Sequence, residues 1–162
     1  MISKHPTAVI FDNVTILGDN VTIGPFCIIG APAESKKVWG EKGHGVIIGN
    51  NVIIHGHVTI DSGATRSTYI GDDTFIMKGV HIGHDAEIQN GVTIAPHALI
   101  GGYVMIGEKT NLGMGCIIHQ RLYIPRYCMI GMGSVITKKT ELTENGVYVG
   151  APARWIRENN RE

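Results

Sequence analysis

The sequence predicts an all-β fold, a parallel β-helix in which short strands and tight turns wind into stacked coils. The main evidence is a strict period of six between residues 70 and 136, where every sixth residue is isoleucine or leucine. These anchor residues are Ile70, Ile76, Ile82, Ile88, Ile94, Ile100, Ile106, Leu112, Ile118, Ile124, Ile130 and Ile136. Because an α-helix repeats near 3.6 residues and a plain strand at 2, a sustained six-residue repeat indicates a hexapeptide solenoid.

A second register supports this interpretation. Four residues after each anchor the side chain is small or β-branched, with Leu122 as the exception. This register contains Thr74, Val80, Ala86, Val92, Ala98, Val104, Thr110, Cys116, Cys128 and Ser134. Residues two apart on a strand point the same way, so both registers are expected to fill the coil. Glycine often follows an anchor, as at Gly83 and Gly101, and we expect a positive φ there.

Taken in order, the chain predicts one domain over residues 1–162, with about six coils of three hexads each. The first anchors are Phe11, Leu17, Ile23 and Ile29. The repeat then breaks at 31–46 and at 61–69, and such insertions form external loops, often on the binding face. After Ile136 the period fades. We expect a cap over 138–162, with a short helix from 154 to 162, because an open solenoid end exposes strand edges.

Composition excludes several classes of protein. The chain has 14 basic and 14 acidic residues, without the basic excess expected of a nucleic-acid-binding protein. It shows no apolar leader and no run near the ~18 apolar residues of a membrane span, so we expect a cytoplasmic protein. Cys27, Cys116 and Cys128 all fall on the inward register. They are interpreted as core residues, not as a disulfide set or metal ligands.

One outward column is apolar. Stacking residues 18 apart places Leu99, Ile117 and Val135 in a row beneath His81. An exposed apolar strip usually marks a contact surface, so this face is predicted to be a subunit interface.

The turn that follows this face carries the candidate catalytic residues. It stacks Gly83, His84 and Asp85 over Gly101, Gly102 and Tyr103, then over His119, Gln120 and Arg121, and then over Thr137, Lys138 and Lys139. His84 faces outward and is the candidate general base, because imidazole titrates near neutral pH. Asp85 would fix its tautomer, and Gly102 would offer a backbone N–H to a substrate oxygen. No Ser or Cys is stacked beside His84, which favours direct attack by the substrate over a covalent intermediate.

The sequence resembles the UDP-N-acetylglucosamine acyltransferase family of lipid A synthesis. The resemblance rests on His5-Pro6-Thr7-Ala8, Ile23 to Ile28, Pro32 to Lys36, His81 to Asp85 and His119-Gln120. It implies a left-handed β-helix, a homotrimer with the site between subunits, and the roles just given for His84, Asp85 and Gly102. Nucleotide-sugar contacts are then assigned to Lys36, His81, Tyr103, His119, Gln120 and Arg121, with Glu34 as a further candidate. Tyr103 departs from the family, which has a histidine at that position.

Other departures suggest a short acyl donor. The chain lacks the family's C-terminal helical domain, and Met132 stands where long-chain members have a small residue. The segment Val149 to Arg154 is similar to the end of CoA-dependent hexapeptide acetyltransferases. We therefore assign donor contacts to Met114, Met132 and Lys138. Acetyl-CoA or another acyl thioester is expected as a cosubstrate, without a tightly bound cofactor.

The sequence thus favours an enzyme that transfers a short acyl group to a hydroxyl or amine of a nucleotide-linked amino sugar. One alternative is long-chain transfer from acyl carrier protein to UDP-N-acetylglucosamine. Another is a zinc carbonic anhydrase of the gamma type, whose tail is similar. Such enzymes need two histidines five residues apart, and no pair among the eight histidines has this spacing, so no metal site is expected. A non-catalytic structural trimer is the remaining alternative.

Overall fold

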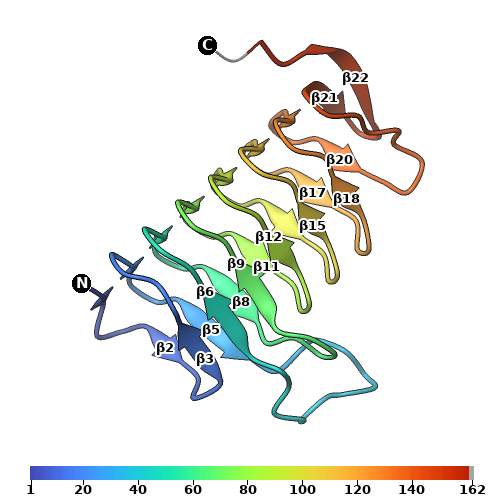
Figure 1. The fold of residues 1–162 in the computed structure, drawn as a ribbon. Helices are drawn as coiled ribbons and strands as arrows, with labels where there is room; N and C mark the ends of the chain where they lie inside the picture. Colours follow the sequence, from blue (N-terminus) through green and yellow to red (C-terminus); the bar gives the residue numbers. More distant parts are fainter. Residues whose placement is uncertain (161–162) are drawn as a thin grey trace.

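A computed structural model describes residues 1–160 and shows a parallel β-helix, which confirms the predicted all-β class. Short strands form three sheets, which are the three faces of a prism, and the coils stack from the N-terminus to the C-terminus (Figure 1). The described residues contain no helix that is long and apolar enough to span a membrane.

The three sheets, named A, B and C here, take one strand in turn from each coil. Sheet A contains β1 (Ser3–Lys4), β4 (Thr22–Ile23), β7 (Ile53–Ile54), β10 (Phe75–Ile76), β13 (Thr93–Ile94), β16 (Asn111–Leu112), β19 (Met129–Ile130), β21 (Gly146–Gly150) and β22 (Ala153–Glu158). Sheet B contains β2 (Val9–Ile10), β5 (Ile28–Ala31), β8 (Thr59–Asp61), β11 (His81–Ile82), β14 (Leu99–Ile100), β17 (Ile117–Ile118) and β20 (Val135–Ile136). Sheet C contains β3 (Val14–Ile16), β6 (Val46–Ile48), β9 (Thr68–Ile70), β12 (Glu87–Ile88), β15 (Met105–Ile106) and β18 (Tyr123–Ile124). Sheet B alone has 7 strands, so the stack is longer than the expected six or so coils.

Both inward registers line the core as the sequence predicts. The anchors of neighbouring coils stand side by side, for example Ile82 beside Ile100 and Ile100 beside Ile118. The second register is buried with them, including Ala86, Val104 and the thiols of Cys27, Cys116 and Cys128. Each isoleucine buried in this way contributes about 1.5–3 kcal/mol, so the column is the main source of stability.

The first two anchors were predicted one residue too late. Phe11 is 38% exposed and Leu17 is 70% exposed. Ile10 and Ile16 occupy the inward positions instead, paired with Ile29 and Ile48. The spacing from Ile16 to Ile23 is seven residues, so a period of six extended backward from Ile23 loses the register.

The glycine that follows an anchor has a different role from the predicted one. Positive φ falls on the third residue after the anchor, as at Asp85 (58°), Tyr103 (60°) and Arg121 (61°). The glycine directly after the anchor is needed because the next coil passes too close: a Cβ on Gly83 would lie 2.8 Å from the Gly102 nitrogen. This close approach, not backbone conformation, selects glycine at that position.

The C-terminal segment is a strand, and the predicted helix from 154 to 162 is wrong over the described part of that range; residues 161–162 lie outside it. Strand β22 pairs antiparallel with β21, with Gly146 opposite Glu158 and Gly150 opposite Ala153. Pairing with the last strand of sheet A satisfies backbone groups that a helix would leave exposed at that edge.

The apolar column on sheet B has the predicted register. His81 pairs with Leu99, Leu99 with Ile117, and Ile117 with Val135. Leu99 is 44% exposed and Ile117 is 43% exposed. Val9 and Ile28 are exposed apolar residues on the same sheet, separated from the strip by Thr59 and His81.

We expect this strip to be covered in a homotrimer. Light scattering coupled to gel filtration should give about three times the chain mass of 17.5 kDa. Leu99→Lys should release monomers, because a lysine at the centre of an apolar contact leaves a buried charge unpaired. The matched control is Tyr123→Lys, which alters an exposed residue on sheet C. A wild-type monomer at micromolar concentration would contradict the interface.

Candidate functional site

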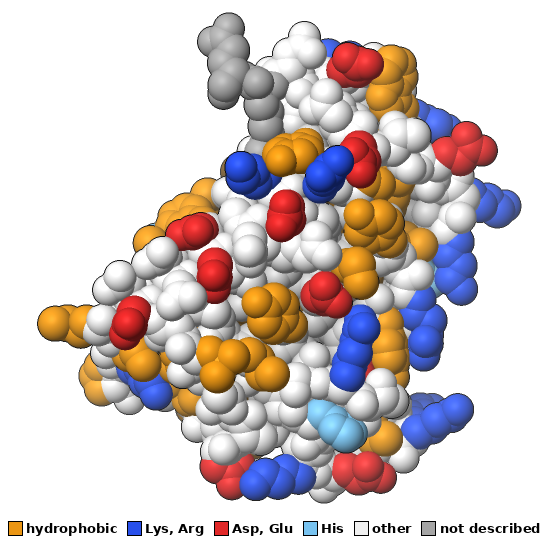
Figure 2. Space-filling model, viewed as in Figure 1, with side chains coloured by type: hydrophobic (Ala, Val, Ile, Leu, Met, Phe, Trp, Pro, Cys, Tyr) orange, Lys and Arg blue, Asp and Glu red, His pale blue; other side chains and the backbone are white. Residues whose placement is uncertain are grey.

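The corner where the chain passes from sheet B to sheet C collects the polar groups of the molecule. Both insertions leave the stack there: residues 32–45 connect β5 to β6, and residues 62–67 connect β8 to β9. The next turn down the stack holds His84 and Asp85. In Figure 1 the first loop projects from this edge, and in Figure 2 Lys and Arg side chains line the same edge.

The two loops are tied to each other. The His44 N–H donates to the Gly63 carbonyl at 2.7 Å, and the Ser67 hydroxyl donates to the His44 carbonyl at 2.7 Å. The Gly45 N–H donates to the Ser62 hydroxyl at 2.8 Å. These bonds fix the loops as one surface beside the turn that holds His84 and Asp85.

Asp85 anchors the second loop in addition to orienting His84. Its buried carboxylate accepts backbone N–H groups from Ala64 (2.7 Å), Thr65 (2.7 Å) and Arg66 (2.9 Å), and the Thr65 hydroxyl at 2.7 Å. Burial acts to raise the pKa of Asp85. The hydrogen bonds from Thr65, His84 and Ala64 outweigh it and hold the pKa well below its usual range. The aspartate therefore stays ionised and holds both the loop and the imidazole.

The imidazole of His84 is held in one orientation by Asp85. Its Nδ1 lies 2.7 Å from the Asp85 carboxylate, and since a carboxylate only accepts, Nδ1 donates and Nε2 is the acceptor in the neutral ring. The side chain points away from the core yet is only 16% exposed. Tyr103 meets its edge with ring centroids 5.2 Å apart at 84°.

Gly102 lies directly beneath the imidazole. A Cβ on Gly102 would lie 2.8 Å from His84 Nε2 and 3.0 Å from Cε1. Glycine is therefore required for the ring to occupy this position. Within residues 1–160 no acceptor pairs with the Gly102 N–H, whereas at another corner the Asn50 N–H is capped by Asp72 at 2.7 Å. An N–H without an acceptor, one coil from His84, is available to a substrate oxygen, as an oxyanion donor must be.

Asp61 is a member of the site that sequence analysis missed. It is the residue after anchor Ile60, where the next two coils have Gly83 and Gly101. Its carboxylate is 8% exposed and lies 3.9 Å from His81 Nε2, while His81 Nδ1 is 2.8 Å from the Thr59 hydroxyl. Burial raises the pKa of Asp61 to about 6, Glu34 adds to the rise, and His81 and His84 oppose it. A polar residue at a glycine position, directly before an insertion, was the signal in the sequence.

The residues predicted to contact the nucleotide sugar lie along this corner, in the first loop, on β11 and in the turns that follow β14 and β17. The Arg121 guanidinium lies over the Tyr103 ring, 4.0 Å from its centroid. His119 and Gln120 are exposed one coil beyond Gly102, with His119 Nδ1 2.9 Å from the Gln120 carbonyl. Lys36 and Glu34 line a cavity of about 410 Å³ in the first loop, together with Ser35 and Trp39.

The predicted donor residues do not all meet His84 within one chain. Met114 and Met132 are exposed on the corner between sheets A and B, a different edge of the prism. Lys138 is on the His84 corner, at the last turn of the stack.

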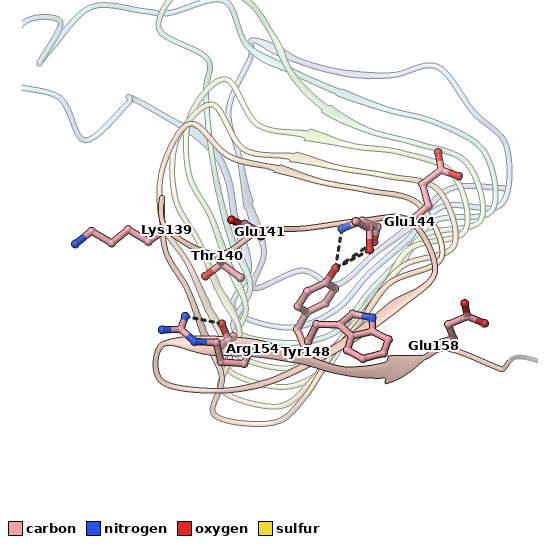
Figure 3. A pocket seen from close by; sticks show the side chains of 10 residues that line it. Lys139, Thr140, Glu141, Glu144, Tyr148, Arg154 and Glu158 are labelled. Atoms are coloured by element: carbon pink, nitrogen blue, oxygen red, sulfur yellow. Dashed lines mark hydrogen bonds between the residues drawn. The ribbon is translucent and has the colours of Figure 1, made fainter.

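A larger cavity of about 720 Å³ lies under the C-terminal hairpin, at the end of the stack. Figure 3 shows Lys139 and Arg154 on one side of it and Glu144 and Glu158 on the other, with the Tyr148 hydroxyl bonded to Thr143. Lys139 joins this cavity to the His84 corner, since it belongs to the last turn of that corner.

The described residues of this corner offer neither a cluster of three metal-ligating side chains nor a cysteine thiol. Among residues 1–160 no group of three or more His, Cys, Asp and Glu side chains is arranged to hold a metal ion. Cys116 is buried in the core, and burial raises its pKa to about 12. Its thiolate is therefore not formed near neutral pH.

We expect Asp85→Asn to destabilise the protein by about 1.5–3 kcal/mol, because an amide cannot replace a carboxylate as acceptor for several N–H groups. Since the folded-state pKa is lowered, the stabilisation is present above the unfolded value of about 3.9 and is lost as pH falls below it. Urea denaturation at pH 7 and at pH 3–4 measures this difference. Asp73→Asn, at the equivalent turn position after Ile70, is the control. Equal stability of Asp85→Asn and wild type at pH 7 would contradict the anchoring role.

We expect Gly102→Ala to lower activity by displacing the His84 ring, not by unfolding the turn. The loss should therefore shrink when His84 is already alanine, because residues that act through one contact are non-additive. Steady-state kinetics of the two single variants and the double variant measure this coupling. Fully additive losses would show that Gly102 acts independently of His84.

Comparison with known proteins identifies similar sequences. The family model described as bacterial transferase hexapeptide (six repeats) matches residues 67–102. An acyl-[acyl-carrier-protein]–UDP-N-acetylglucosamine O-acyltransferase of Helicobacter pylori (strain Shi470) is 36% identical over 127 residues, covering 76% of this chain and 47% of the relative. The chain thus spans about half the length of that curated relative.

Solved structures with a similar fold include a UDP-N-acetylglucosamine acyltransferase and a sugar N-acetyltransferase. A UDP-N-acetylglucosamine acyltransferase from Bacteroides fragilis superposes with a TM-score of 0.82 at 26% identity, covering 98% of this chain and 73% of the other. A perosamine N-acetyltransferase variant from Caulobacter crescentus, in complex with CoA and GDP-perosamine, shares the fold with a TM-score of 0.62 at 19% identity, covering 98% and 57%. The chain is thus a hexapeptide-repeat β-helix that is similar, in sequence and in fold, to UDP-N-acetylglucosamine acyltransferases.

Proposed function

We propose that this protein is an acyltransferase that moves a short acyl group from a thioester to a nucleotide-linked amino sugar. The observation that carries the proposal is the His84 centre. Nδ1 is held by an ionised Asp85 at 2.7 Å, and Nε2 lies over Gly102, whose N–H is uncapped within the described chain. The named relatives act on UDP-N-acetylglucosamine with an acyl donor, which supports the same reaction class here.

The proposed mechanism is direct attack by the acceptor. His84 Nε2 removes the proton from the acceptor hydroxyl or amine as it attacks the thioester carbonyl. The Gly102 N–H stabilises the developing oxyanion. Collapse of the tetrahedral intermediate breaks the C–S bond, and the imidazolium gives the proton to the leaving thiolate. Asp85 holds the ring and stabilises its charged form throughout.

Charges around the centre suit a nucleotide-sugar acceptor. Lys36, Arg121 and Lys138 are exposed along the same corner and would meet the diphosphate. Tyr103 and Arg121 form a stacked pair against which a sugar or base could pack. In a homotrimer, Met114 and Met132 would line the donor site from the neighbouring copy. Acetyl-CoA is the donor that we propose, because the family resemblance aligns Met132 with a position at which long-chain members have a small residue.

Thiol release should be measured with acetyl-CoA and with a long-chain acyl carrier protein, each against a panel of nucleotide sugars. His84→Ala should lower turnover by about 10²–10⁴-fold, the usual effect of losing a general base. Asp73→Ala is the control, because Asp73 is exposed on the corner between sheets C and A, which holds none of the proposed acceptor or donor contacts. Wild-type preference for the long-chain carrier would overturn the short-chain donor. Retention of more than a tenth of turnover in His84→Ala, with loss in Asp73→Ala, would overturn the site.

A further inference from the structure

The inference concerns Asp61, which the mechanism above does not use. Its carboxylate is a charged group that is more than nine-tenths buried at the mouth of the His84 turn. Within residues 1–160 no side chain donates a hydrogen bond to it; His81 Nε2 lies 3.9 Å away, and the pKa of Asp61 is lowered only in part by His81, His84 and the backbone of Glu34. By contrast, five groups donate hydrogen bonds to Asp85. A buried carboxylate that lacks such donors, like that of Asp61, lowers the stability of the fold unless a bound ligand supplies them.

The groups that face Asp61 define what that ligand can be. They are His81 from β11, His84 from the next turn, and Glu34 from the first loop. Neither Lys nor Arg of the described chain forms an ion pair with Asp61 or Glu34. The carboxylates of Asp61 and Glu34 therefore form a small negative patch inside this corner, whose rim carries Lys36, Arg66 and Arg121. A ligand that is complementary to both the negative patch and the basic rim has a cationic group next to an anionic one.

We propose that Asp61 is a specificity-determining residue that receives the amino group of the acceptor, so that the reaction is N-acylation of an amino sugar nucleotide. The inference rests on the proposed function and specifies its acceptor. The ammonium would contact Asp61 while the diphosphate meets the basic rim. A hydroxyl acceptor offers no charge to match the buried carboxylate and would leave it desolvated.

The step balances without another reactant. The bound ammonium loses one proton to Asp61, and the neutral amine attacks the thioester carbonyl to form the C–N bond. His84 takes the second proton from nitrogen as the C–S bond breaks and delivers it to sulfur. The products are an amide and a free thiol, and the proton on Asp61 returns to solvent.

The raised pKa of Asp61 predicts that binding of the acceptor depends on pH. Because burial raises its pKa to about 6, the carboxylate ionises between pH 5 and 7, and recognition of an ammonium should strengthen over that range. His81, His84 and Glu34 face Asp61, and their charges contribute to its pKa and therefore to this pH range. The KM for an amine acceptor should therefore fall as pH rises through about 6 in the wild type. This pH dependence of KM should be absent from Asp61→Asn.

The test uses two nucleotide sugars that differ at one ring carbon, one with an amine and one with a hydroxyl, and acetyl-CoA as donor. The wild type should prefer the amine. Asp61→Asn should raise the KM for the amine by about 10- to 100-fold, the effect of a lost charge-assisted hydrogen bond, and change the hydroxyl acceptor little. Calorimetric binding of each sugar nucleotide without donor provides a readout that does not depend on turnover. Glu41→Gln, an exposed carboxylate on the first loop, is the matched control.

The outcomes separate the two proposals. Acylation of the hydroxyl sugar in preference to the amine, or equal effects of Asp61→Asn on both, would overturn the role of Asp61 and leave acyl transfer intact. No thiol release with either acceptor would overturn the proposed function and this inference with it. Asp61→Asn should fold, because it removes a buried charge; circular dichroism and urea denaturation verify this before the kinetics are interpreted.

Discussion

The close backbone contact between successive coils is the constraint on which the rest of the structure depends. The Gly83 N–H donates to the Ile100 carbonyl at 2.8 Å, and the Gly101 N–H donates to the Ile118 carbonyl at 3.0 Å. At a spacing of about 4.8 Å, a Cβ at Gly83 or Gly101 would come too close to the next coil, and the third residue of each of these turns has positive φ. The second residue of the successive turns carries an outward side chain at His84, Gln120 and Lys138. This outward column is a consequence of how coils stack.

The insertions disturb this contact and require a substitute. Backbone N–H groups of residues 64–66 leave the stack and have no neighbouring coil to bond. Asp85 supplies the acceptor, which explains why a charged residue is tolerated at a buried turn position with a φ of 58°. The same carboxylate orients His84. Loop order and catalytic geometry are therefore coupled, and a change in the second loop should be felt at the imidazole.

Two buried carboxylates in this corner have opposite properties for one physical reason. Asp85 accepts from His84, Thr65 and three backbone N–H groups, which outweighs burial and keeps it ionised. No side chain of the described residues donates a hydrogen bond to Asp61, so burial dominates, the like charge of Glu34 adds to it, and the pKa rises to about 6 although His81 and His84 oppose the rise. A fully satisfied carboxylate is suited to hold structure, whereas an incompletely satisfied one is suited to bind a ligand or exchange a proton.

The sequence by itself determined the period, the two inward registers and the outward columns, because these follow from a repeat that every coil must obey. It also placed His84, Asp85 and Gly102 on one corner, since residues 18 apart stack. Only the tertiary structure decided the features that depend on the breaks in the repeat. Asp61, Thr65 and the loops come together there through pairings 20 to 22 residues apart, which a period of 18 does not predict. The seven-residue step after Ile16 was missed because it breaks the period of six. The terminal hairpin was missed because a local pattern does not encode which free edge a segment will pair with.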